Sequence, residues 1–329
     1  MANLDMKVTL AQPRGFCAGV DRAIEIVERA LELYGAPVYV LHEIVHNRFV
    51  VDDLSARGVV FVDDLCEVPR GAVTIYSAHG VSDSVVATGV ERGLRVIDAT
   101  CPLVTKVHLQ AQAYEGQGRE VILIGHPGHP EVEGTRGRIR GRVHVLSTVE
   151  EVRALEVEDA GRLSYVTQTT LSVDDTREVI DALVARFPTI RGPALKDICY
   201  ATQNRQNAVR EMSEEIDLLL VVGSQNSSNS NRLLELGERK GVPSHLIDGA
   251  HDIDPAWFQA GTTVGVTAGA SAPERLVQQV LERLRELGVV EVREMAGERE
   301  TTTFRLPPEL TPGETTRCLL YTSDAADEL

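Results

Sequence analysis

The sequence predicts an α/β fold made of three similar units, and three observations lead to this prediction. Short apolar runs alternate with amphipathic helices along nearly the whole chain, which is typical of largely parallel sheets. Cys17, Cys101 and Cys199 each stand just before such a helix, roughly one subdomain apart. Most apolar runs end in small, hydroxylated or imidazole residues. In open α/β sheets, ligands bind beyond the carboxyl ends of strands, so these runs predict one shared site.

The first element is a strand within KVTLAQPRGFCAGV, which leads to Cys17. Ile24, Val27, Leu31 and Tyr34 then share one face of a predicted helix that stops at Gly35. Buried strands are expected to follow within VYVLHEIVHN, VTIYSAHG, LRVIDATCP, EVILIGHPGHPE, LSYVTQTTLS, LLLVVGSQNSSNS and TVGVTAGASAPE. Later helices are expected in VDDTREVIDALVARF, SNRLLELGERKG and PERLVQQVLERLRELG.

The spacing of the cysteines sets the predicted domain boundaries. We expect α/β units at 19–101, 102–198 and 199–310, with the N-terminal strand of 1–18 joining the third. Residues 311–329 follow the Pro-rich stop LPPEL and show no periodicity. We expect this tail to be non-native or disordered.

Composition excludes several classes of protein. The net charge of −16 over 329 residues argues against binding to nucleic acid or to anionic membrane surfaces. No apolar run approaches the ~20 residues of a membrane span. The start, MANLDMKVTL, lacks the basic and apolar regions of a signal peptide. We therefore expect a cytoplasmic protein whose thiols are reduced.

The three cysteines that precede helices suggest a metal centre. A helix N-terminus favours a thiolate, and three thiolates on one centre leave a fourth position open for substrate, which suggests an iron–sulfur catalyst. Three buried cysteines acting as small apolar residues, or a zinc site completed by the histidines of GHPGHPE, remain alternatives. Cys66 in a connecting stretch and Cys318 in the tail are left out of the site.

Polar residues at strand ends are the other candidates for chemistry. Glu131 is placed to act as a general acid, although a solvated loop glutamate is the simpler interpretation. Thr169 and the neighbouring Thr170 could relay a proton, or could reflect β propensity alone. Other strand ends supply hydroxyls, amides and imidazoles, which suit an anionic ligand. Some of these side chains could simply cap helices. The residues are His46, His79, His129, Ser227, Ser228, Asn229 and Ser271.

Taken together, these strings closely resemble the 4-hydroxy-3-methylbut-2-enyl diphosphate reductase family, also called IspH or LytB. The matching stretches are PRGFCAGV, VHNR, SAHGV, DATCPLVTKVH, GHPGHPEVEGT, TQTTLSVDDT, DICYATQNRQ, VVGSQNSSNSNR and GVTAGASAPE. They run in order over nearly the whole chain except the tail.

The resemblance implies three α/β units around a central cavity that holds a 4Fe–4S cluster. Cys17, Cys101 and Cys199 would be its ligands, and the fourth iron would be open to substrate. Two-electron reductive dehydroxylation would give isopentenyl and dimethylallyl diphosphate, the last step of the non-mevalonate isoprenoid pathway, with reduced ferredoxin or flavodoxin as electron donor. Glu131 and Thr169 would handle protons. The diphosphate would be held by His46, His79, His129, Thr169, Ser227, Ser228, Asn229 and Ser271.

Two other functions remain open at this point. A zinc-dependent hydrolase of a phosphorylated metabolite could use the same cysteines and histidines. A redox-sensing or ligand-binding protein, without turnover, could use the cysteines alone. Metal and sulfide content would separate the hydrolase from the reductase, and the non-enzymatic protein would show no turnover with any electron donor.

Overall fold

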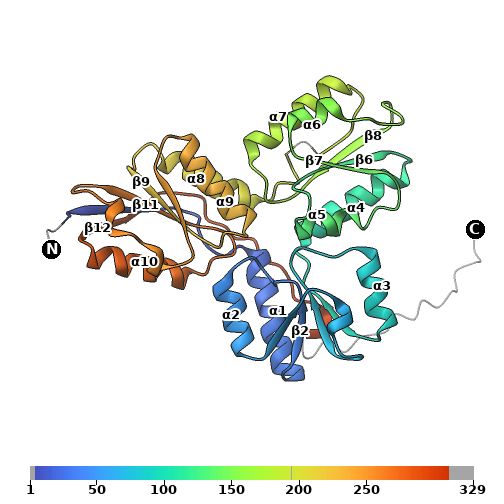
Figure 1. Cartoon of the computed structure of the whole chain (residues 1–329), viewed down its shortest axis with the longest axis horizontal. Helices are drawn as coiled ribbons and strands as arrows, with labels where there is room; N and C mark the ends of the chain where they lie inside the picture. The colour runs from blue at the N-terminus through green and yellow to red at the C-terminus, as the bar shows by residue number, and fades with distance from the viewer. Residues whose placement is uncertain (1–3, 194, 311–329) are drawn as a thin grey trace, which may run out of the picture.

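The computed structural model describes residues 4–193 and 195–310, and the tail predicted at 311–329 lies outside the described residues. The chain forms three wholly parallel sheets of four, three and five strands, each with its own helices, which confirms the predicted α/β class. Figure 1 shows the three sheets as three lobes whose inner ends meet near the middle of the molecule.

The first lobe has the strand order β3-β2-β4-β5. Its elements are α1 (Ala18–Tyr34), β2 (Val38–Leu41), α2 (Arg48–Ala56), β3 (Val59–Val62), the 3-10 turn η1 (Leu65–Glu67), β4 (Val73–Tyr76), α3 (Asp83–Glu91) and β5 (Arg95–Asp98). Helix α1 ends as predicted, because Gly35 has φ +73°, a conformation that glycine adopts readily.

The second lobe has the strand order β7-β6-β8. Its elements are α4 (Pro102–Gly116), β6 (Glu120–Ile124), α5 (Pro130–Arg136), β7 (Val143–Leu146), α6 (Val149–Ala154), β8 (Leu163–Thr167) and α7 (Val173–Arg186). The short helix α5 falls within GHPGHPEVEGT and is not among the helices that the sequence predicted. Pro130 at its first position and the His129 cap explain this difference, because both favour a helix start.

The third lobe has the strand order β10-β9-β11-β1-β12. Its elements are β1 (Met6–Leu10), α8 (Tyr200–Met212), β9 (Leu218–Val222), α9 (Ser228–Arg239), β10 (Ser244–Ile247), η2 (Ala250–Asp252), η3 (Pro255–Trp257), β11 (Thr263–Ala268), α10 (Glu274–Glu286) and β12 (Val289–Glu294). The first strand of the chain therefore lies inside the last sheet, between β11 and β12.

Each lobe has its own apolar core, and the C-terminal segment joins two of them. After β12 the chain returns to the first lobe, where Leu306 and Leu310 pack against the core beside α1 and the turn η4 (Pro308–Leu310) forms (Figure 1). We propose that the three lobes correspond to the units 19–101, 102–198 and 199–310. No helix among the described residues is long and apolar enough to cross a membrane.

Candidate functional site

A cavity of about 710 Å³ lies where the three lobes meet, and it collects residues from all of them. Every residue that the sequence singled out for catalysis, substrate or metal lines it, together with Thr170, Thr202, Gly19 and apolar side chains such as Val20, Val45 and Leu103. Thr170 is the residue that the sequence analysis named with Thr169 as a possible proton relay. None of the described residues that line the cavity is a lysine or an arginine.

The three cysteines stand at equivalent positions, each as the N-cap of a helix. Cys17 precedes α1, Cys101 precedes α4 and Cys199 precedes α8. Backbone hydrogen bonds hold each loop to another strand end, with Cys101 N–H donating to Ala78 O at 3.0 Å and Cys199 N–H donating to Thr169 O at 3.1 Å. Parallel strands and the helices that follow them thus direct three thiols into one cavity.

Burial decides the protonation of these thiols. It raises the pKa of Cys101 to about 12 and that of Cys199 to about 11, and it also raises the pKa of Cys17. The expected effect of the helix ends is present but smaller, since backbone N–H groups only partly offset desolvation. A cationic centre is needed to convert all three thiols to thiolates.

The donor set fits an iron–sulfur cluster. All three cysteines are free, and such clusters are held by cysteine thiolates. Gly19 leaves the space beside them open, because a Cβ there would lie 2.7 Å from the Cys101 sulfur. Among the described residues, no group of three or more His, Cys, Asp or Glu side chains is placed to hold a single metal ion. The three free thiols and the open space at Gly19 therefore fit such a cluster.

Three imidazoles line another part of the same cavity. The rings of His46 and His79 stack with centroids 4.1 Å apart, and His129 meets them edge-on at 5.5 and 5.9 Å. Burial lowers the pKa of His129 to about 4, and burial followed by the neighbouring imidazoles lowers the pKa of His79 well below its usual value. Both rings are therefore neutral at pH 7 without a ligand.

Hydrogen bonds indicate which ring nitrogens can donate to a ligand. His129 Nδ1 accepts from the Glu131 N–H at 3.2 Å, so its neutral ring carries the proton on Nε2. His46 Nδ1 lies 3.0 Å from a Glu43 carboxylate oxygen, and His46 can donate from both nitrogens only when protonated. The Nε2 atoms of His46 and His129 are buried without a partner in the described structure. An anionic ligand would satisfy both.

Hydroxyls and an amide complete this part of the cavity. Ser271 Oγ donates to His46 O at 2.8 Å, and Ser227 caps α9 by accepting from the Ser230 N–H at 3.3 Å. Ser228 Oγ lies 3.1 Å from Thr170 Oγ1 and so joins the third lobe to the second. Both polar side-chain atoms of Asn229 are buried and lack a partner among the described residues. These groups supply neutral donors in place of lysine and arginine.

Glu131 lies between the two sets of residues, in the first turn of α5. Its carboxylate accepts from the Thr169 N–H at 2.7 Å and from Thr169 Oγ1 at 2.9 Å. Its side chain is only 2% exposed, and burial raises its pKa to about 7 although both Thr169 bonds oppose the shift. A carboxyl group poised near neutrality and fixed by two hydrogen bonds is suited to general acid chemistry.

Sequence reasoning missed Glu43 and Arg205. Glu43 holds His46 from a loop whose shape the sequence did not reveal. Arg205 is completely buried in α8 and bonds to the Cys17 loop. A signal for Arg205 was available, because it falls at helical spacing with Val209, Met212 and Ile216, so a charge stands on the buried face of the helix.

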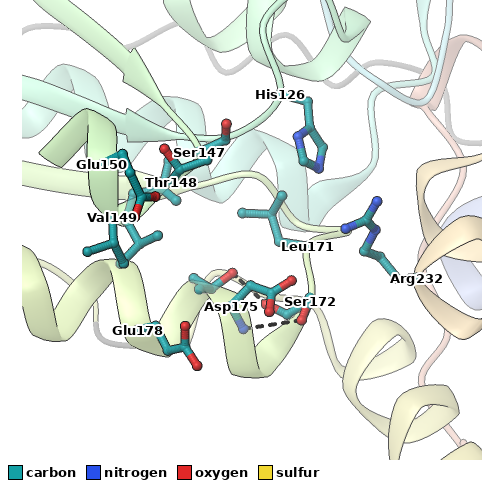
Figure 2. A pocket seen from close by; sticks show the side chains of 13 residues that line it. His126, Ser147, Thr148, Val149, Glu150, Leu171, Ser172, Asp175, Glu178 and Arg232 are labelled. Atoms are coloured by element: carbon teal, nitrogen blue, oxygen red, sulfur yellow. Dashed lines mark hydrogen bonds between the residues drawn. The ribbon is translucent and has the colours of Figure 1, made fainter. Parts of the chain in front are cut away.

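A second cavity, about 870 Å³ in volume, lies between α6, α7 and α9. Figure 2 shows His126 and Arg232 at one side of it and Glu150 and Glu178 at the other. None of the residues predicted for catalysis, substrate or metal lines it. Two of its charged groups have protein partners, since Arg232 pairs with Glu235 and Asp175 pairs with Arg239, whereas His126 Nε2 is buried without a partner among the described residues.

Comparisons with known proteins identify the family of the chain. Residues 8–285 match the family model described as LytB protein. The chain is 63% identical over 306 residues to 4-hydroxy-3-methylbut-2-enyl diphosphate reductase of Bordetella pertussis, covering 93% of this chain and 94% of that protein.

Solved structures give the same result. The E-1-hydroxy-2-methyl-but-2-enyl-4-diphosphate reductase of Plasmodium falciparum superposes with a TM-score of 0.88 at 37% identity, covering 93% of this chain and 96% of that one. A second solved structure, (E)-4-hydroxy-3-methyl-but-2-enyl diphosphate reductase, the terminal enzyme of the non-mevalonate pathway, gives a TM-score of 0.61 at 33% identity. It covers 85% of this chain and 99% of its own.

Proposed function

The chain belongs to the LytB protein family, and from that premise we propose how its central cavity carries out the family's reaction. The reaction is the reduction of 4-hydroxy-3-methylbut-2-enyl diphosphate to isopentenyl and dimethylallyl diphosphate, the terminal step of the non-mevalonate pathway. Two electrons and two protons enter, the C–OH bond breaks, a C–H bond forms and water leaves. The cavity must therefore bind a diphosphate, deliver protons and receive electrons.

The family is one of iron–sulfur enzymes, and we assign the cluster to Cys17, Cys101 and Cys199. Three half-buried cysteines around one cavity, with Gly19 leaving room beside them, are the observation that supports this assignment. When bound, a 4Fe–4S cluster supplies the two electrons and a Lewis-acidic iron that lacks a protein ligand.

The diphosphate is held by the imidazoles and hydroxyls of the cavity. His129 donates from Nε2, and His46, whose Nδ1 lies beside the Glu43 carboxylate, presents to the same ligand its Nε2, which has no partner among the described residues. Asn229 adds an amide, and hydroxyls come from Thr169, Ser227, Ser228 and Ser271. Buried donors without partners in the described structure support this role for His46, His129 and Asn229, because an anion would satisfy them. His79 stacks on His46 and limits the motion of its ring.

Glu131 supplies the protons. With a pKa of about 7, a large fraction of the carboxyl groups is protonated at neutral pH. Thr169 fixes the carboxyl group through its N–H and its hydroxyl, and that hydroxyl also lines the cavity. A proton can therefore pass to substrate from Glu131 directly or through Thr169. Release of water as the leaving group requires such a donor.

The first test is iron and acid-labile sulfide per chain in protein purified without oxygen. The proposal expects about four of each, followed by reductase activity with reduced ferredoxin or flavodoxin, the class of donor that we propose. Zinc without sulfide would instead favour a hydrolase. Absence of any metal after anaerobic reconstitution would contradict the assignment of the cysteines.

A further inference from the structure

Arg205 is the largest fully buried side chain in the described part of the molecule, with 0% exposure. It lies in α8, two turns after Cys199, and does not line the central cavity. Placing a guanidinium in a protein interior costs several kcal/mol unless its donors are satisfied. The burial of Arg205 must therefore be explained by the groups to which it donates hydrogen bonds.

Each hydrogen bond of Arg205 is made to one of three places: the loop before Cys17, the first turn after Cys199, or the C-terminal segment that follows β12. Nε and Nη2 donate to Gly15 O at 3.1 and 2.6 Å, and Nη2 also donates to Phe16 O at 3.2 Å. Nη1 donates to Ala201 O at 3.0 Å, in the first turn after Cys199. One planar group thus fixes the loop that carries Cys17 relative to the helix that carries Cys199.

Glu300 completes the arrangement from the C-terminal segment. Its two carboxylate oxygens accept from Arg205 Nη1 at 3.0 Å and from Nη2 at 3.2 Å, and Oε1 also accepts from Asn204 Nδ2 at 3.1 Å. Tyr200 adds a parallel link, because its hydroxyl accepts from the Ala18 N–H at 3.4 Å, beside Cys17. Glu300 orients the guanidinium through these bonds. The guanidinium lies closer to the Cys17 loop than Glu300 does, because it bonds directly to Gly15 O and Phe16 O.

We propose that Arg205 is a positioning residue for the cluster, which holds Cys17 and Cys199 at their required separation and places a positive charge that raises the cluster's reduction potential. Glu300 orients Arg205 and partly offsets that charge. The inference rests on the proposed ligation by the three cysteines. A lysine cannot make the same set of hydrogen bonds, because only the planar guanidinium can donate to several carbonyls and a carboxylate at once. Charge and hydrogen bonding near a cluster both tune its potential.

The test compares R205K, R205Q, E300Q and the double variant R205Q/E300Q, all loaded with iron and sulfide anaerobically. Cluster retention is followed by absorbance during exposure to a chelator, and the midpoint potential by spectroelectrochemical titration. R205Q should lower the midpoint potential, E300Q should raise it and the double variant should lie between them. R205K should keep the potential near that of the unsubstituted chain but lose its cluster at least several-fold faster.

R210Q is the matched control, since Arg210 lies on the same helix but bonds Asn207 and Asp174 away from the cysteines. It should leave both potential and retention unchanged. Shifts of the same sign in R205Q and E300Q, or potentials equal to that of R210Q in all variants, would overturn the proposal. If R205Q does not load, R205K and E300Q still decide it, because R205K should lose its cluster faster at an unchanged potential whereas E300Q should raise the potential. If the unsubstituted chain itself binds no iron and sulfide, that result would instead contradict the proposed function.

Discussion

The two groups of chemical residues in the central cavity respond to burial in opposite ways. Around the cysteines, desolvation raises the pKa of Cys101 to about 12, so the thiol form is favoured. Around the histidines, desolvation lowers the pKa of His129 to about 4, so the neutral ring is favoured. Burial thus favours the neutral form of Cys101 and of His129 alike. In the proposed function the cysteines bind a metal cluster and the histidines bind a diphosphate, so the two groups would take ligands of opposite charge.

The largest effect on cluster content and turnover should come from substitutions of the three cysteines. Changing Cys17, Cys101 or Cys199 to Ser should reduce both cluster content and turnover to near background, because serine is a poor ligand for an iron–sulfur cluster. Iron, sulfide and activity per chain measure this. C66S is the control, since Cys66 is exposed and lies outside the cavity. A Ser variant that keeps a full cluster would remove that cysteine from the ligand set.

The next effect should come from Glu131, which stands between the two groups. E131Q should lower kcat about 10²- to 10⁴-fold, the usual contribution of a general acid, while KM changes little. The control is E133Q, an exposed glutamate on the same short helix. Steady-state kinetics with a chemical reductant checks this prediction. A loss below tenfold would take Glu131 out of the proton-donating role.

Breaking the histidine group should act mainly on binding. H46N or H129N should raise KM about 10- to 100-fold, because each removes a hydrogen bond to a charged group, worth about 1.5–3 kcal/mol. Cluster content should be unaffected. H251N is the control, as the His251 side chain is 79% exposed. An unchanged KM would show that the diphosphate binds elsewhere.

The smallest effect is the dependence of stability on pH in the metal-free protein. Glu131 has a pKa of about 7 when folded and an ordinary value near 4.5 when unfolded. Between these values the folded state binds more protons, so stability should fall as the pH rises through this window. E131Q should therefore gain stability at pH 8, by at most about 3 kcal/mol, with the gain vanishing near pH 4.

His129 should give the reverse slope, because its folded pKa of about 4 lies below its ordinary 6.5. Stability from this group should be full above pH 6.5 and should be lost as the pH falls toward 4. Melting temperatures of E131Q, H129N and the unsubstituted chain between pH 4 and 8 separate the two groups. An E131Q gain of equal size at every pH would contradict the assigned cause.

Local patterns in the sequence predicted much of the fold, because alternation and capping act over a few residues. The helix from Ala18 to Tyr34 and its stop at Gly35 follow from its apolar face and a glycine that tolerates positive φ. Cys17, Cys101 and Cys199 could be recognised as helix caps for the same reason. The structure then places the three thiols and the predicted polar residues around one cavity.

Contacts between distant segments could not be predicted in this way. The bond from Arg205 to Glu300 joins α8 to a returning segment that has no regular secondary structure at that point. The pairing of His46 with Glu43 depends on the shape of a loop. A comparison of the two cavities leads to a similar conclusion. The larger one is lined by none of the residues predicted for catalysis, substrate or metal, so size alone would have indicated a different site.

The position of β1 has a consequence for how the chain is made. Met6–Leu10 leaves the ribosome first, but its sheet neighbours β11 and β12 begin only at Thr263 and Val289. At 5–20 residues per second, this strand waits on the order of half a minute for its partners. The Cys17 loop follows β1 directly, so this loop cannot be fixed until β11 and β12 have been synthesised. Insertion of a cluster into the proposed site should therefore follow the synthesis of β12.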